Sequence, residues 1–170
     1  MTDPARKYCS GRVVLMPKIE IPKHHYLVGQ RRFLPGIEYL GFLECFGVSI
    51  GGDVGEDGLR EYIAKKLDNE IKGVVVESVD DLVHEFERPF THMPNEPAEF
   101  ARFERYLSRH FVARVKLPEV ITTDPAEHIG SVVLSLDQVC ALKPAVRPCS
   151  FEAIMKTDRL LYGHKIDPEG

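Results

Sequence analysis

The spacing of apolar residues along the chain predicts a mixture of short strands and amphipathic helices. Runs rich in apolar and β-branched residues predict strands over 12–21, 24–33, 39–50, 74–77, 113–122 and 130–136. Apolar residues at helical spacing predict helices over 59–71, over 78–86, from 97 to 111 and over 150–162. We therefore expect an α+β fold, with helices packed on one face of a mainly antiparallel sheet.

The helix over 59–71 is predicted to be amphipathic, with one apolar and one charged face. It follows a glycine and acid cluster, GGDVGEDG, in which Asp57 can cap the first turn. Pro89 ends the helix over 78–86, and Pro97 opens the next one. No linker divides the chain, so we expect one domain over 1–170, with loose ends at 1–10 and 164–170.

Composition excludes several classes of protein. Of the 170 residues, 44% are apolar and 28% are charged, which is typical of a globular protein rather than a disordered or membrane protein. The formal charge is −4 and the basic residues are scattered, which argues against nucleic acid as a partner. The N-terminus has no apolar signal core, so a cytoplasmic location is expected. The four cysteines lack CxxC spacing and are read as reduced thiols.

The loop before the helix over 59–71 is one candidate ligand site. Glycines ahead of a helix N-terminus, such as Gly52, can present backbone amides to a phosphate. The neighbouring Asp53 would repel a phosphate, however, and the loop lacks the Lys-Ser/Thr or GxGxxG pattern of nucleotide sites. A calcium loop also fails, because Gly55 and Ala64 stand where ligands are needed. A plain turn with a capped helix is the simpler interpretation.

A second candidate is a group of acidic residues and histidines around Pro89. On a helix, His84 and Glu87 would lie on one face, pair, and raise the pKa of the histidine. His92 and Glu96 follow in the next loop. A solvated helix end explains the same residues and is the favoured interpretation. No HxH or HExxH pattern occurs, so no metal and no cofactor are predicted.

One stretch resembles a known family. The run VVVESVDDLVHEFERPFTHMPNEPAEFARFERYLSRHF followed by VKLPEV is similar to the two-helix crossover and next strand of the tunnelling fold, as in 6-pyruvoyl-tetrahydropterin synthases. The resemblance implies a small-ligand enzyme in which Glu119 anchors the ring of the ligand and His92 carries a proton. It places Asp80 or Asp81 and Glu99 at other family positions. The family's zinc-binding HxH is absent from the matching strand GFLECFGVS.

The sequence thus leaves two functions open. Because no complete catalytic constellation is present, we expect a non-enzymatic structural subunit that acts through protein–protein contacts, either with itself or in a larger complex. The alternative is a tunnelling-fold enzyme, or a degenerate relative lacking the zinc triad, with His92, Glu119 and His84 as catalytic candidates. Gly52, Asp53 and Glu99 are the ligand-binding candidates.

Overall fold

The computed structural model describes residues 3–17, 22–32 and 41–163, and it confirms an α+β fold. Nine strands are described: β1 (Lys7–Pro17), β2 (His25–Arg31), β3 (Leu43–Glu44), β4 (Gly47–Gly51), β5 (Ile71–Lys72), β6 (Val75–Pro89), β7 (Arg105–Lys116), β8 (Thr122–Thr123) and β9 (His128–Ser135). The α-helices described are α1 (Gly55–Lys66), α2 (Leu136–Ala141) and α3 (Pro148–Tyr162). Short 3-10 helices cover Pro4–Arg6, Leu67–Asn69, Ala98–Arg102 and Lys143–Ala145.

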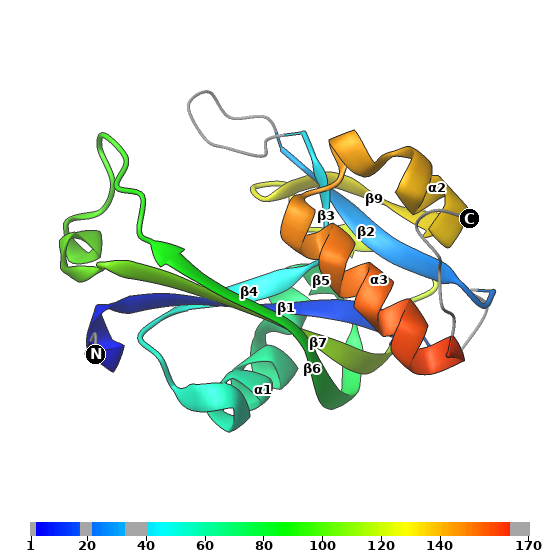
Figure 1. Cartoon of the computed structure of the whole chain (residues 1–170), viewed down its shortest axis with the longest axis horizontal. Coiled ribbons are helices and arrows are strands. Elements are labelled where there is room, and N and C mark those ends of the chain that lie inside the picture. Colours follow the sequence, from blue (N-terminus) through cyan, green and yellow to red (C-terminus); the bar gives the residue numbers. More distant parts are fainter. Residues whose placement is uncertain (1–2, 18–21, 33–40, 164–170) are drawn as a thin grey trace.

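The strands form a central four-stranded sheet and two smaller sheets (Figure 1). The central order is β4-β1-β7-β6, and the second sheet has the order β3-β2-β9. The inner strands β1 and β7 run parallel in one register from Lys7↔Arg105 to Pro17↔Val115, while their outer neighbours are antiparallel. Residues 7–10, expected to be loose, therefore begin a central strand. The expected loose end at 164–170 lies outside the described residues.

Alternate residues of β1 and β7 supply two separate cores. Val13 and Phe111 pack with Ile63 of α1 on one face of the central sheet. Val14 packs with Ile154 of α3 on the opposite face, because neighbouring side chains of a strand point in opposite directions. The helices therefore lie on both faces, whereas a single covered face was expected.

The helix expected over 78–86 is wrong, because these residues belong to β6. The pairing of β6 with β7 shifts register between Val76 and Ser78, between Val79 and Leu82, and again before His84. Each bulge inserts residues that have no partner across the ladder. The insertions break the two-residue alternation of a strand and leave apolar residues at a spacing that imitates a helix.

The helix expected from 97 to 111 is also wrong. Its first part is the short 3-10 helix Ala98–Arg102, and the rest lies in β7. Most of β7 is buried on both faces, so its apolar residues do not alternate with polar ones. The helix over 59–71 is confirmed as α1 and the 3-10 turn that follows it, although α1 begins earlier, at Gly55. The C-terminal helix is confirmed as α3.

Candidate functional site

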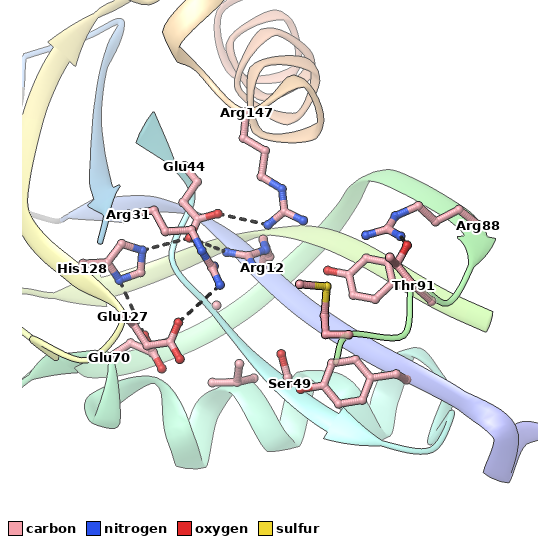
Figure 2. Close-up of a pocket in the computed structure, with 15 residues that line it drawn as sticks. Arg12, Arg31, Glu44, Ser49, Glu70, Arg88, Thr91, Glu127, His128 and Arg147 are labelled. Atoms are coloured by element: carbon pink, nitrogen blue, oxygen red, sulfur yellow. Dashed lines mark hydrogen bonds and ion pairs between the residues drawn. The ribbon is translucent and has the colours of Figure 1, made fainter. Parts of the chain in front are cut away.

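A cavity of about 480 Å³ opens over the α3 side of the central sheet (Figure 2). Tyr8 and Arg12 of β1 line it, together with Tyr106 of β7, and these side chains share a face with Val14. This face is apolar under α3 and polar where the cavity opens. The remaining lining residues are Arg31, Glu44, Gly47, Val48, Ser49, Glu70, Arg88, Thr91, Met93, Glu127, His128 and Arg147.

A buried carboxylate organises one wall of the cavity. Glu44 of β3 has 0% exposure, and its oxygens lie 3.0 Å from Arg147 Nη1, 3.1 Å from Arg31 Nη1 and 3.4 Å from Arg12 Nη1. His128 Nε2 lies 3.0 Å from Glu44 Oε1. Burial alone would raise the pKa of Glu44, but Arg12, the hydrogen bond from His128 and the other arginines together hold it well below its ordinary value. Glu44 is therefore ionised and gathers three guanidinium groups.

The arginines impose a positive potential on the cavity. Burial by itself raises the pKa of the Tyr106 phenol, yet Arg12 and Arg147 outweigh it, and the pKa is lowered. Burial lowers the pKa of His110, and Arg12 lowers it further. The Tyr106 shift favours the anion, which is the expected response to nearby positive charge, whereas burial is the larger cause of the His110 shift.

Glu70 lies next to His128 and has an unusual pKa. Burial first, and then the nearby Glu127 carboxylate, raise the pKa of Glu70 to about 7, although His128 acts against this rise. Glu70 Oε2 lies 3.8 Å from His128 Nδ1, and Arg31 Nη2 lies 3.8 Å from Glu127 Oε2. Figure 2 shows Glu70 and Glu127 side by side below His128. A carboxyl group with a pKa near neutrality can accept and return a proton.

The far end of the cavity is aromatic. Arg88 stacks over the Tyr106 ring at 4.6 Å and donates a hydrogen bond to Thr91 Oγ1 at 3.1 Å. Within the described part of the chain, the Arg88 guanidinium makes no ion pair with a carboxylate. Tyr8 stacks against Tyr106, their ring centroids 6.3 Å apart. This end therefore combines ring surfaces with a cation that can bind a ligand.

The structure does not bring the three catalytic candidates together. His92 lies in the connection before β7, where its Nδ1 contacts Glu96 Oε1 at 2.5 Å and its Nε2 contacts the Phe103 carbonyl at 2.9 Å. Glu119 is exposed beyond the other end of β7. The 12 residues of β7 put about 40 Å between them.

His84 lies elsewhere, in a smaller cavity of about 250 Å³ beside the first turn of α3. Its Nδ1 accepts a hydrogen bond from Lys156 Nζ at 3.0 Å. The expected pairing with Glu87 is not formed, because β6 is a strand and Glu87 contacts Lys7 instead. Burial and the Lys156 charge lower the pKa of His84, opposite to the expected rise.

The ligand-binding candidates lie outside the main cavity. Asp53 Oδ1 accepts hydrogen bonds from the Gly55 amide at 3.0 Å and from Arg109 Nη1 at 2.9 Å, so it closes the turn before α1. Gly52 has a positive φ of 126°, which serves the same turn. Glu99 is exposed in the short 3-10 helix. The turn interpretation accounts for the geometry of this loop.

The residues that do line the cavity were missed because they are far apart in sequence. Glu44 and Arg147 are 103 residues apart, and Glu44 and His128 are 84 apart. One signal was present. Glu44 interrupts the apolar run YLGFLECFGVSI, and a charge inside a buried strand requires a partner.

Among residues 3–17, 22–32 and 41–163, no group of three or more His, Cys, Asp or Glu side chains could hold a metal ion. None of the helices described is both long and apolar enough to cross a bilayer.

Comparison with known proteins identifies the fold. No protein-family profile and no curated protein matches the sequence. Among solved structures, the MutT protein from Methanosarcina mazei Go1 matches with a TM-score of 0.62 and 14% identity, covering 94% of this chain and 97% of that one. The MutT NUDIX hydrolase from Burkholderia pseudomallei matches with a TM-score of 0.58 and 12% identity, covering 88% and 97%. The E. coli dihydroneopterin triphosphate pyrophosphohydrolase matches with a TM-score of 0.54 and 14% identity, covering 87% and 92%.

These findings correct both functional expectations. The tunnelling-fold resemblance is wrong, because the stretch read as two helices is largely β6 and β7. The expectation of a non-enzymatic structural or complex subunit is contradicted, because the solved structures that share this fold include a protein named as a NUDIX hydrolase and one named as a triphosphate pyrophosphohydrolase. The chain has the Nudix-type α+β fold.

Proposed function

We propose that the chain is a hydrolase that cleaves a phosphoanhydride bond of a small phosphorylated compound in the 480 Å³ cavity. The observation that carries this proposal is the meeting of four arginines with the partly buried carboxyl group of Glu70 in one cavity. The fold adds support, since one solved structure that shares it is named as a triphosphate pyrophosphohydrolase. A cytoplasmic location and self-association remain predictions within this proposal.

The arginines would bind the phosphate groups. A guanidinium offers five donors in a planar fork that matches phosphate oxygens. Arg88 has donors available, whereas Arg12, Arg31 and Arg147 are oriented by Glu44 with their guanidinium groups in the cavity wall. The lowered pKa of Tyr106 indicates the positive potential that a polyanion needs. As the bond breaks, the same donors would stabilise the charge on the departing phosphate.

Glu70 would act as the general base. With a pKa of about 7, a large share of this carboxyl is ionised at neutral pH and can remove a proton from an attacking water. The hydroxide formed would attack phosphorus while the bridging oxygen leaves with its electron pair. The leaving group is a phosphate anion, so its departure requires no added proton.

Phosphoryl-transfer enzymes commonly use Mg²⁺, which is held by one or two carboxylates together with substrate phosphates. The donor set does not match a protein-only metal site, because no group of three or more His, Cys, Asp or Glu side chains among the described residues could hold a metal ion, and Glu44 is already committed to three arginines and a histidine. The steps above therefore use only the side chains of this chain, and the assay includes Mg²⁺ and Mn²⁺ as variables.

The test is a hydrolysis screen of the purified protein. Nucleoside triphosphates, nucleoside diphosphate sugars and inorganic pyrophosphate are incubated with Mg²⁺, with Mn²⁺ or with EDTA, and the products are separated by ion-exchange chromatography. For a compound that is cleaved, Glu70→Gln should lower kcat about 100-fold or more. Arg88→Ala should mainly raise KM, because it removes a phosphate donor.

Matched controls are available on exposed surfaces. Glu61→Gln on α1 and Arg159→Ala on α3 change the same residue types outside the cavity and should leave kcat and KM unchanged. The proposal fails if no phosphorylated compound is cleaved under any of the three conditions. It also fails if the Glu70 and Glu61 variants retain the same activity.

A further inference from the structure

Three groups, Glu44, His128 and Glu70, form a row across the cavity wall. Glu44 Oε1 lies 3.0 Å from His128 Nε2, and Glu70 Oε2 lies 3.8 Å from His128 Nδ1. The exposed fractions of the side chains are 1% for Glu44, 2% for His128 and 18% for Glu70. Figure 2 shows the imidazole between the two carboxylates. Water therefore reaches the outer member of the row and is excluded from the inner two.

The inner contact determines where the imidazole carries its proton. Glu44 is ionised and surrounded by arginines, so it can only accept hydrogen bonds. His128 Nε2 must therefore be the donor of the 3.0 Å bond, and a neutral imidazole then has its lone pair on Nδ1. This nitrogen is buried, and it has no hydrogen-bond partner among the described residues.

Glu70 is the group that faces this lone pair. If Glu70 is protonated, its O–H can donate to Nδ1, and if it is ionised, a proton on Nδ1 can donate to it. Closing the gap from 3.8 Å to a normal hydrogen bond needs a shift of about 1 Å, and catalytic contacts commonly tighten when a ligand binds. The approach of Glu70 to His128 Nδ1 is favourable, because it gives a buried nitrogen a hydrogen-bond partner.

We propose that Glu70 and His128 share one proton, and that Glu44 holds the imidazole in the tautomer that makes this possible. Glu70 is then the group that touches the attacking water, and His128 is a positioning residue that acts through it. The proton taken from water would move from Glu70 Oε2 to His128 Nδ1, giving an imidazolium that Glu44 stabilises. No other reactant is needed. The role of this proton transfer in hydrolysis rests on the proposed function, whereas the shared proton and the tautomer do not.

Other charged groups act on the pair and set the pH range. Glu127 and Asp124, from the loop before β9, raise the pKa of Glu70, whereas Arg12 of β1 lowers it. On the inner side, Glu44 faces His128. Arg31 of β2 contacts both Glu44 and Glu127. The shared proton is therefore expected to titrate near neutral pH.

The test uses NMR, so that its result does not depend on activity. Imidazole ¹⁵N shifts at pH 8 report the tautomer of His128, and ¹³C shifts of the Glu70 carboxyl report its titration between pH 5 and 9. We expect a proton on Nε2 and a lone pair on Nδ1. We also expect the Glu70 and His128 signals to change over one common pH range.

A substitution then tests the coupling. His128→Gln keeps an amide donor toward Glu44 but removes the basic nitrogen, and the Glu70 midpoint should move upward by about one pH unit. If a substrate has been found, the acidic limb of its kcat/KM profile should move by the same amount. His25→Gln, at the start of β2, is the control and should leave the Glu70 midpoint unchanged.

The inference is overturned if wild-type His128 carries its proton on Nδ1, or if the two groups titrate independently. A Glu70 midpoint unchanged in His128→Gln overturns it as well. If His128→Gln does not fold, the wild-type tautomer and titration decide the question alone. Loss of the proposed function would appear separately, as an absence of hydrolysis in a protein whose Glu70 and His128 still titrate together.

Discussion

Replacing Glu44 by glutamine should destabilise the fold strongly, because three guanidinium groups lose their buried counter-charge. Glu44 is buried, with 1% of its side chain exposed, and its oxygens lie 3.0–3.4 Å from arginine nitrogens. Removing one partner of a buried ion pair typically costs about 3–5 kcal/mol. For a chain of this length, that cost corresponds to a fall in Tm of about 10 °C. Urea denaturation followed by circular dichroism gives the free energy of unfolding directly.

The same variant should also change the pH dependence of stability. The pKa of Glu44 is lower in the folded protein than in the unfolded chain, where it is near 4.5. Its contribution to stability is therefore fully present above pH 4.5 and is lost as the pH falls toward the folded-state pKa. The difference between wild type and Glu44→Gln should shrink on acidification from pH 6 to pH 3. Glu61→Gln, on exposed α1, is the control.

Two results would refute this reasoning. A loss of less than about 1 kcal/mol at pH 7 would mean that the arginines find other counter-charges or water. A difference that stays constant from pH 6 to pH 3 would mean that the Glu44 charge is not what stabilises the cluster. In either case, the ion pairs that define the cavity wall would not have the geometry described above.

Three further predictions test other parts of the structure. Glu70→Gln should have a free energy of unfolding about 1–2 kcal/mol higher than wild type at pH 8, because the raised pKa makes ionisation of Glu70 costly in the folded state. The two proteins should become equally stable near pH 4.5. Thermal melts across this pH range check the prediction, and a wild type that is more stable than the variant at pH 8 contradicts it. Gly47→Ala should lower the free energy of unfolding in urea by at least about 2 kcal/mol, because the added Cβ would lie 2.4 Å from the Gly11 carbonyl oxygen. An unchanged free energy of unfolding would mean that β1 and β4 can move apart to make room. Ile63→Ala should cost about 2–5 kcal/mol by the same assay, because Ile63 is fully buried between α1 and the sheet, and a cost under 1 kcal/mol would contradict this packing.

The sequence predicted those elements whose pattern reflects one buried face. Helix α1 was found because Leu59, Ile63 and Leu67 recur at helical spacing and are the residues buried there. Strand β6 was missed because its bulges replace strict alternation with a spacing of three or four. Strand β7 was missed because both of its faces are covered.

The candidate site could not be predicted in the same way. The members of the Glu44 cluster come from β1, β2, β3, β9 and the residue before α3, so no short window of sequence contains two of the arginines with their shared carboxylate. His84 and His92 were predicted as catalytic candidates because they are close together in sequence and have acidic residues nearby. Their actual partners, Lys156 for one and Glu96 with a backbone carbonyl for the other, depend on tertiary structure or on loop geometry.

The parallel pairing of β1 with β7 has a consequence for how the protein is made. Residue 7 pairs with residue 105, so after its synthesis β1 waits for about a hundred more residues before its central partner exists. At 5–20 residues per second, this delay is roughly 5–20 s. During that time β1 can pair with β4, but its other edge stays open. Chaperone binding to the nascent chain should therefore be strongest before residue 116 has emerged.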